Sequence, residues 1–139
     1  KMSKSDPTGC VFLMDSPEEI ARKFKRAITD SDTERCVRYN PENKPGVANL
    51  MNIYASVTGK SFDEIESEFA GKGYGVFKPA VGDAVIETLR PIREEAERIL
   101  ADKAYLKQVY TDGAMKASSV ARKTLRKVYK RVGLVEKPL

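Results

Sequence analysis

The first five residues of the chain gather side chains that suit contact with a phosphorylated substrate. Lys1-Met2-Ser3-Lys4-Ser5 places two ammonium groups and two hydroxyls in one short segment. Asp6-Pro7 and Gly9 follow, and they predict a loop, because proline disfavours helix at the preceding residue and glycine permits turns. Lysine supplies positive charge, and a loop can close over a substrate on which negative charge develops. Residue types and spacing leave two interpretations open: a loop that binds a polyphosphate, or a solvated basic terminus.

A second group of basic side chains lies near the end of the chain. Residues 113–139 contain eight Lys and Arg against one acid, for a net charge of +7, whereas residues 1–112 have a net charge of −2. Charge separated in this way favours an anionic partner, with nucleic acid ahead of a membrane surface. A solvated basic helix face is the competing interpretation, and Tyr129 could stack on a base or simply pack. Four lysines recur at spacings that place them on one side of a helix: Lys116, Lys123, Lys127 and Lys130.

The composition excludes several kinds of active site. The chain contains no histidine, which rules out serine–histidine and cysteine–histidine nucleophile pairs, histidine-ligated zinc and imidazole base catalysis. Two cysteines, Cys10 and Cys36, are too few for a disulfide framework or a four-thiolate metal site, and we expect both as reduced thiols. No metal site is predicted.

Two further patterns are better explained by structure than by chemistry. Gly71-Lys72-Gly73-Tyr74-Gly75 is glycine-rich like a phosphate-binding loop, but it follows a predicted helix rather than a strand and lacks the full nucleotide-binding fingerprint. We therefore interpret it as a turn between helices. The clustered acids Glu94, Glu95 and Glu97 are interpreted as solvated helix surface, with Glu94 and Arg98 as an i, i+4 pair.

Apolar residues at helical spacing predict an all-α helical bundle, and no segment shows the alternation of a strand. Capping boxes, in which a serine is followed three residues later by glutamate, predict helices beginning after Ser16 and Ser61. Between them a helix is expected from residue 47 to Gly59, after a long irregular connection over residues 29–46. The first helix is expected to turn Ile20, Phe24, Ala27 and Ile28 inward and Arg22, Lys23, Lys25 and Arg26 to solvent.

The second half of the chain predicts three further helical segments. The first covers residues 79–100, and Pro91 is expected to kink it or divide it. A short helix capped by Asp102 is expected to close at Asp112-Gly113, and the last helix is expected to end at Gly133. No run approaches the roughly 18 apolar residues that a membrane helix needs, and the N-terminus lacks the layout of a signal peptide. The stripe expected to be buried over residues 79–100 consists of Val81, Val85, Leu89, Ile92, Ala96 and Ile99.

The opening pentad and several later segments resemble a known family. K-M-S-K-S is the second signature motif of class I aminoacyl-tRNA synthetases, and Asp6-Pro7 extends the match. The segments at residues 37–39, 44–47, 49–50, 52–54, 71–78 and 85–92 are similar to those that follow this motif in bacterial tryptophanyl-tRNA synthetases. The match favours the tryptophan enzymes over the related tyrosine enzymes, which usually vary the pentad.

The resemblance implies an enzyme that activates tryptophan with ATP and transfers it to tRNA(Trp). By position, Lys1 and Lys4 would be catalytic, because they would stabilise the pyrophosphate that leaves as adenylate forms. Mg²⁺ would accompany ATP in the parent enzyme, with no cofactor bound by this chain itself. Members of the family are cytoplasmic homodimers whose C-terminal helical domain reads the anticodon. The expected ATP-binding residues are Met2, Ser3 and Ser5, and the expected tRNA-binding residues are Lys116, Arg122, Lys123, Lys127 and Lys130.

The resemblance also implies that the chain is the C-terminal part of a longer enzyme. Residues 1–15 would be the KMSKS loop and a remnant of the catalytic domain, and residues 16–139 the helical anticodon-binding domain. The nucleotide-binding fold, the first signature and the tryptophan pocket would lie upstream of Lys1, so we expect the chain alone to be inactive. Two alternatives are a stand-alone helical RNA-binding module without catalysis and a structural bundle that binds a protein. Neither a membrane nor DNA is an expected partner.

Overall fold

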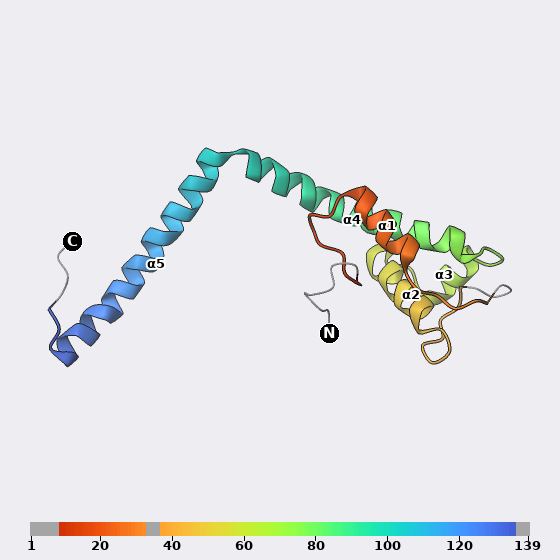
Figure 1. The fold of residues 1–139 in the computed structure, drawn as a ribbon, viewed down its shortest axis with the longest axis horizontal. Coiled ribbons are helices and arrows are strands. Elements are labelled where there is room, and N and C mark those ends of the chain that lie inside the picture. The colour runs from red at the N-terminus through yellow and green to blue at the C-terminus, as the bar shows by residue number, and fades with distance from the viewer. Residues whose placement is uncertain (1–8, 33–36, 136–139) are drawn as a thin grey trace. The chain divides into compact units, whose positions relative to one another are not determined.

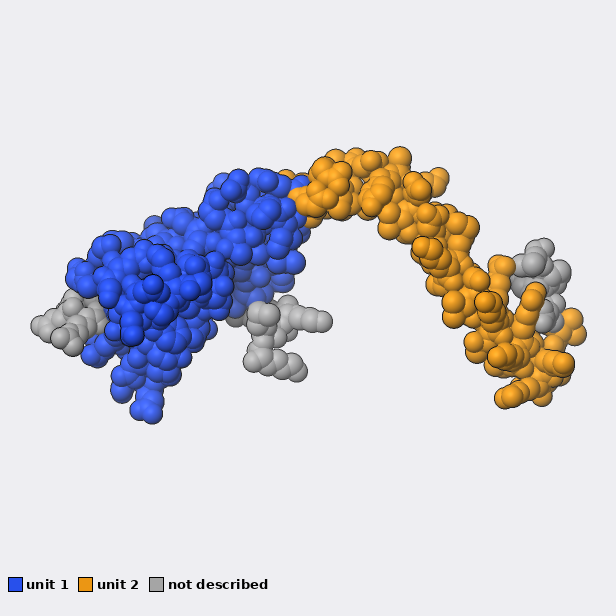
Figure 2. All heavy atoms as spheres, turned by 180° about the vertical axis from the view of Figure 1, so that it is seen from behind, with its two compact units in different colours: residues 1–94 blue, residues 95–139 orange. Residues whose placement is uncertain are grey.

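The computed structural model of the chain describes residues 9–32 and 37–135, and the regular secondary structure within them is entirely helical (Figure 1). The predicted all-α class is therefore confirmed. The helices are α1 (Pro17–Arg26), α2 (Pro45–Thr58), α3 (Phe62–Glu68), α4 (Tyr74–Ala101) and α5 (Lys103–Val132). The chain divides into two compact units, residues 1–94 and residues 95–139 (Figure 2). The division expected after residue 15 is of another kind, because it separates a remnant of the catalytic domain from the anticodon-binding domain. It stays a prediction.

The predicted capping boxes begin α1 and α3. The Ser16 hydroxyl accepts a hydrogen bond from the Glu19 N–H, and the Glu19 carboxylate accepts one from the Ser16 N–H. Ser61 and Glu64 make the same reciprocal pair at the start of α3. A side-chain cap of this kind contributes about 1 kcal/mol to helix stability. Local sequence therefore determines where both helices begin.

α1 is shorter than its apolar pattern predicts. It ends at Arg26, and Ala27 is its C-cap. Ile20 and Phe24 are buried as expected, but Ile28 lies beyond the helix and is 88% exposed. The prediction that Ile28 faces inward is wrong, because residues beyond the C-cap no longer follow the helical spacing.

α4 begins earlier than predicted and continues through two prolines. Its first residue is Tyr74, so the glycine-rich turn ends at Gly73, and the helix includes both Pro79 and Pro91. Pro91 therefore does not divide the segment, and the alternative expectation, a kink at Pro91, stays a prediction. A proline removes one backbone N–H and leaves the carbonyl four residues earlier without its helical partner. Both prolines are exposed, so water can bind these carbonyls on the solvent side of the helix.

The buried stripe of α4 is also shorter than predicted. Val81 and Val85 are buried and Leu89 is half-buried, but Ile92 is 49% exposed. The next residue, Arg93, is buried instead, with 9% of its surface exposed. A guanidinium therefore occupies the inward position at the end of the first unit.

α5 is one helix where two were predicted. Asp102 caps it as expected, because its carboxylate accepts a hydrogen bond from the Tyr105 N–H. The helix then continues through Gly113 and ends at Gly133, so the expected break at residues 112–113 is wrong. One glycine in a helix interior costs only about 1 kcal/mol relative to alanine, which is too little to end a helix. None of the residues of α5 is buried.

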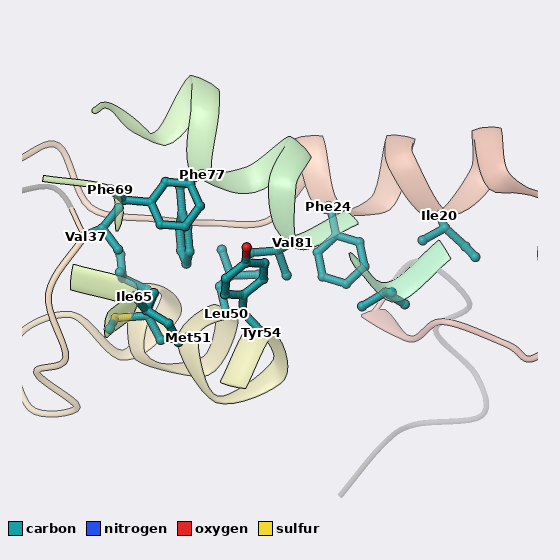
Figure 3. Close-up of a cluster of buried hydrophobic side chains, with 12 residues drawn as sticks. Ile20, Phe24, Val37, Leu50, Met51, Tyr54, Ile65, Phe69, Phe77 and Val81 are labelled. Carbon is teal, nitrogen blue, oxygen red and sulfur yellow. The ribbon is translucent and has the colours of Figure 1, made fainter. Parts of the chain in front are cut away.

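The hydrophobic core of the first unit lies among α1, α2, α3 and the first half of α4 (Figure 3). Three aromatic rings, those of Tyr54, Phe69 and Phe77, meet edge to face at its centre, with centroids separated by 5.0 to 6.3 Å. Such pairs stabilise by roughly 0.5–1.5 kcal/mol each beyond the burial of their area. Other core residues are Ile20, Phe24, Val37, Val47, Leu50, Met51, Ile65, Val81 and Val85.

Gly46, in the first turn of α2, lies directly against the chain that follows α1. A Cβ atom at this position would come within 2.2 Å of the Ile28 carbonyl oxygen and 3.2 Å of its carbon. Both are backbone atoms, so they cannot rotate away as a side chain can. The absence of a side chain at residue 46 is therefore what lets α2 pack against the connection.

We expect Gly46→Ala to lower the free energy of unfolding by about 3 kcal/mol, because the added methyl overlaps backbone. Gly75→Ala is the matched control, since a Cβ there meets nothing within 4 Å and the residue lies in the first turn of α4. The control is expected to be neutral or stabilising by up to about 1 kcal/mol. Urea denaturation of both variants and the parent measures the difference. Equal stability of the two variants would show that α2 does not approach residue 28 this closely.

Candidate functional site

The pentad predicted to act on ATP lies outside the described residues. This applies to the expected catalytic residues, Lys1 and Lys4, and to the expected ATP-binding residues, Met2, Ser3 and Ser5. Their roles stay predictions. The described chain nearest to the pentad is the segment from Gly9 to Ser16, which leads into α1.

This segment contains a tight turn held by an aspartate. The Asp15 N–H donates to the Phe12 carbonyl over 3.1 Å, and the Phe12 N–H donates to the Asp15 carboxylate over 2.9 Å. The same carboxylate forms an ion pair with Lys23 of α1. Arg93 of α4 places Nη1 3.5 Å from the Asp15 carbonyl oxygen. We call Asp15, Lys23 and Arg93 the Asp15 clamp.

The Asp15 clamp is shielded from solvent although it joins charged groups. Side-chain exposure is 11% for Asp15 and 17% for Lys23. Burial opposes ionisation of Asp15, but the hydrogen bonds from Lys23 and the Phe12 N–H outweigh it, so the pKa of Asp15 is lowered. The Lys23 ammonium also lies 5.0 Å from the centroid of the Phe12 ring. The prediction that Lys23 faces solvent is therefore wrong, because its flexible stem turns the charge back onto the turn.

A second buried polar group joins the connection after α1 to the starts of α2 and α4. The Lys44 ammonium lies 3.0 Å from Asp30 Oδ1, 2.9 Å from Asp32 Oδ2 and 3.1 Å from the Tyr74 hydroxyl. Tyr74 in turn donates to Asp30 Oδ1 over 2.7 Å. The Lys44 side chain is only 3% exposed. We call these four residues the Lys44 cluster.

The charges of the Lys44 cluster stabilise one another. Burial opposes ionisation of Asp30, but hydrogen bonds from Tyr74, the Asp32 N–H and Lys44 outweigh it and lower its pKa to about 2. Burial disfavours the charged form of Lys44, yet its bonds to Asp32, Tyr74 and Asp30 raise its pKa above the ordinary value. Burial and the bond to Asp30 raise the pKa of Tyr74 to about 12. At neutral pH Lys44 is therefore an ammonium, Asp30 a carboxylate and Tyr74 a neutral phenol.

Sequence reasoning missed both polar groups. Asp30 and Tyr74 lie 44 positions apart, so no local spacing connects them. Arg93 follows Val85 and Leu89 at intervals of four residues, and this spacing could have predicted that it lies on the buried face of α4. The sequence argues against it, because charged residues are rarely buried. The structural interpretation of the glycine-rich segment is supported, because Tyr74 packs against the core and binds Asp30.

The predicted RNA-binding residues lie together on α5. All five are exposed and belong to one continuous helix: Lys116, Arg122, Lys123, Lys127 and Lys130. At a rise of 1.5 Å per residue, Lys116 and Lys130 are separated by about 21 Å along the helix. We call Lys116, Lys123, Lys127 and Lys130 the α5 basic stripe. An exposed row of cations on one side of a helix suits contact with a polyanion.

The acidic cluster on α4 forms a local pair. Arg98 binds Glu95 in a two-pronged arrangement at 2.7 Å, so the expected pairing of Glu94 with Arg98 is wrong. In the part of the chain that the structure describes, no group of three His, Cys, Asp or Glu side chains is arranged to hold a metal ion. Among the described helices, none combines the length and apolar character needed to cross a bilayer.

Comparison with known proteins places the chain in a family. The sequence-family model for class I tRNA synthetases of the tryptophan and tyrosine type matches residues 1–90, which is more than half of the chain. The chain belongs to this family. The match includes the pentad, the Asp15 turn and the Lys44 cluster.

Curated relatives of this synthetase chain align with nearly all of its residues. Tryptophan–tRNA ligases from Wolinella succinogenes and Clostridium tetani are each 48% identical to it over 137 residues, or 97% of the chain. The matched region is 41% of the first relative and 40% of the second. The chain thus spans about two fifths of the length of these relatives.

Solved structures of tryptophanyl-tRNA synthetases resemble the synthetase chain in fold. One from Campylobacter jejuni, complexed with ADP and tryptophan, matches with a TM-score of 0.79 and 26% identity. One from Mycoplasma pneumoniae matches with a TM-score of 0.65 and 27% identity. Each match covers 96% of this chain and 41% of the other.

The Lys44 cluster predicts a specific acid sensitivity. Because the pKa of Asp30 is lowered to about 2 in the folded chain from an ordinary 3.8, ionised Asp30 stabilises the fold above pH 3.8. This stabilisation, about 2 kcal/mol, is lost as the pH falls from about 5 to about 2. Asp30→Asn removes the titrating group. We therefore expect the parent to lose about 2 kcal/mol more than this variant over that range, measured by urea denaturation.

Asp83→Asn is the control, since Asp83 is an exposed aspartate of α4 that makes no ion pair with any described residue. Its acid profile is expected to follow that of the parent. Parallel profiles for Asp30→Asn and the parent would contradict the ionised state assigned to the cluster.

Proposed function

We propose that the chain is the C-terminal part of a tryptophan–tRNA ligase, an enzyme that activates tryptophan with ATP and transfers it to tRNA(Trp). The observation that supports this most directly is the 48% identity to tryptophan–tRNA ligases across 97% of the chain. The family match over residues 1–90, which includes the signature pentad, supports it as well. The solved relative that binds ADP and tryptophan supports the same substrates.

In this proposal the pentad stabilises the leaving group of the first step. Adenylate formation releases pyrophosphate, and negative charge grows on it as the bond to the α-phosphorus breaks. Lys1 and Lys4 would hold this charge, with Met2, Ser3 and Ser5 lining the ATP side of the loop. Losing one such electrostatic contact typically costs about 3 to 4 kcal/mol of transition-state stabilisation. Mg²⁺ would enter as the complex with ATP.

The helices would supply the contact with tRNA. The α5 basic stripe and the adjacent Arg122 present exposed positive charge, which neutralises phosphates and releases counterions. We place the parent enzyme in the cytoplasm as a homodimer, on the strength of the family resemblance. The nucleotide-binding fold and the tryptophan pocket would belong to the part of the relatives that this chain does not match.

The catalytic part of the proposal is tested by tryptophan-dependent exchange of pyrophosphate into ATP. The full-length protein that contains this chain is expected to catalyse exchange, and residues 1–139 alone are expected to be inactive. Lys4→Ala in the full-length protein is expected to lower kcat by about 10²- to 10³-fold. Lys25→Met, which removes an exposed lysine of α1, is the control and should retain activity. Exchange by residues 1–139 alone would overturn the proposal.

The RNA part is tested by tRNA(Trp) binding across a salt series. Neutralising Lys123 and Lys127 with glutamine is expected to weaken binding and to lower the slope of log K against log salt by about 0.7 to 0.9 per lost phosphate contact. Lys103→Gln with Lys107→Gln changes the charge equally on the other side of α5 and should leave the slope unchanged. Unchanged binding after loss of Lys123 and Lys127 would remove α5 from the interface. RNA binding by a full-length protein that lacks exchange activity would instead favour a stand-alone RNA-binding module.

A further inference from the structure

Helix α5 carries an apolar face that stays in solvent throughout the described part of the chain. From Tyr110 onward, apolar residues recur at intervals of three or four positions, which places them on one side of the helix. None of them is buried, and the exposed fraction of the large members ranges from 45% for Val128 to 64% for Tyr110. We call the following set the α5 apolar stripe: Tyr110, Ala114, Ala117, Ala121, Leu125, Val128 and Val132.

Charged residues avoid this side of α5. Between Tyr110 and Val132, at 3.6 residues per turn, every charged side chain lies on the other half of the helix, and all of them except Asp112 are Lys or Arg. The helix therefore separates an apolar side from a basic side, and the basic side includes the α5 basic stripe. Helices in proteins gain most of their stability by packing an apolar face, so the uncovered stripe calls for a partner.

A second copy of α5 fits the stripe poorly. Each copy carries seven cations and one acid between residues 110 and 132, so pairing would bring together two helices with six net positive charges each. Three of the seven stripe residues are alanines, which contribute little toward the roughly 1,200–2,000 Å² that a stable dimer interface buries.

A lipid surface fits the stripe poorly as well. Helices that lie in a membrane interface insert Trp, Phe and Leu, whereas the stripe has no Trp or Phe and a single leucine, Leu125. The alanines Ala114, Ala117 and Ala121 occupy its middle, and small side chains let a neighbouring backbone approach closely. This composition suits a protein surface.

The tryptophan–tRNA ligases that match this chain contain more protein than its 139 residues. The matched region, which includes nearly all of the chain, is only 41% and 40% of their length, so they have a counterpart of α5 in a protein more than twice as long. A surface of the same protein is tethered to α5, which raises its local concentration. A small contact area therefore suffices for such a surface, although it would not hold two separate chains together.

From these observations we infer that the α5 apolar stripe docks on the part of the full-length protein that lies outside residues 1–139. The identity of that part, the nucleotide-binding fold, rests on the function proposed above. The three alanines set the closest approach, and Leu125, Val128 and Val132 supply much of the buried apolar area. Because the cations lie on the other half of the helix, docking leaves the α5 basic stripe in solvent for a polyanion.

Amide hydrogen exchange of α5 in the full-length protein tests the docking. Val128→Ser is expected to speed exchange of the α5 amides by about tenfold or more, because it removes apolar area from the docked face. Val120→Ser is the matched control, since it makes the same substitution on the basic side of the same helix, where Val120 is 68% exposed. Both variants change helix propensity equally, and the control is expected to alter exchange by less than about twofold.

Ala121→Leu is a second variant, and it distinguishes close packing from a general apolar attraction. The larger side chain would hold the docked surface away, so exchange is again expected to speed by about tenfold. On a lipid surface the same substitution would add apolar area and slow exchange instead. Ala104→Leu, at an exposed residue outside the stripe, is its control and should change exchange by less than about twofold.

Pyrophosphate exchange by the same preparations separates the docking from the proposed function. If the unchanged full-length protein shows no tryptophan-dependent exchange into ATP, the proposed function fails, whereas docking is still decided by the amides of α5. Equal amide exchange in Val128→Ser and Val120→Ser would overturn the docking. If Val128→Ser, unlike Val120→Ser, converts a dimer into monomers in sedimentation, a second copy covers the stripe and the docking is overturned. Protection of α5 that requires vesicles of phosphatidylcholine and phosphatidylglycerol would overturn it too.

Discussion

The first unit depends on the burial of one ammonium group. Lys44 directly precedes α2, Asp30 and Asp32 belong to the connection after α1, and Tyr74 begins α4, so a single charge joins three parts of the chain. A buried charge that loses a partner costs about 3 to 5 kcal/mol, which makes the arrangement cooperative. With the connection held in this way, Gly46 can lie against Ile28. The aromatic rings of Tyr54, Phe69 and Phe77 pack edge to face in the hydrophobic core of the same unit.

Much of the helical architecture could be predicted from short-range chemistry. The serine–glutamate boxes at Ser16 and Ser61 and the caps at Asp102 and Gly133 involve residues only a few positions apart, and the structure places all four as expected. The predictions that failed required knowledge of the surroundings. α4 continues through the exposed Pro91, although a proline in a helix interior removes one backbone hydrogen bond and ordinarily kinks or ends the helix.

The pentad, which the sequence offers as the candidate site, lies outside the described residues and stays a prediction. The pentad was identified as a string of five specified residues, and no physical reasoning from composition could have separated it from a solvated basic terminus. The Asp15 clamp was not predictable, because Lys23 follows the pattern of the exposed face of α1 and only the fold shows that it turns back to Asp15. Long-range polar contacts of this kind leave no periodic signal, since they join residues whose separation along the chain is arbitrary.

α5 has one further consequence, for the way salt acts on the molecule. The helix has no buried residue to stabilise it, and it places like charges four residues apart, as at Lys123 and Lys127 or Lys127 and Arg131. Such pairs destabilise a helix by a few tenths of a kcal/mol each, and dissolved ions screen them. Salt therefore favours the helix itself, whereas it would weaken the polyanion contact proposed for the α5 basic stripe. A bound polyanion would replace the dissolved ions, so that helix formation and polyanion binding on α5 become thermodynamically linked.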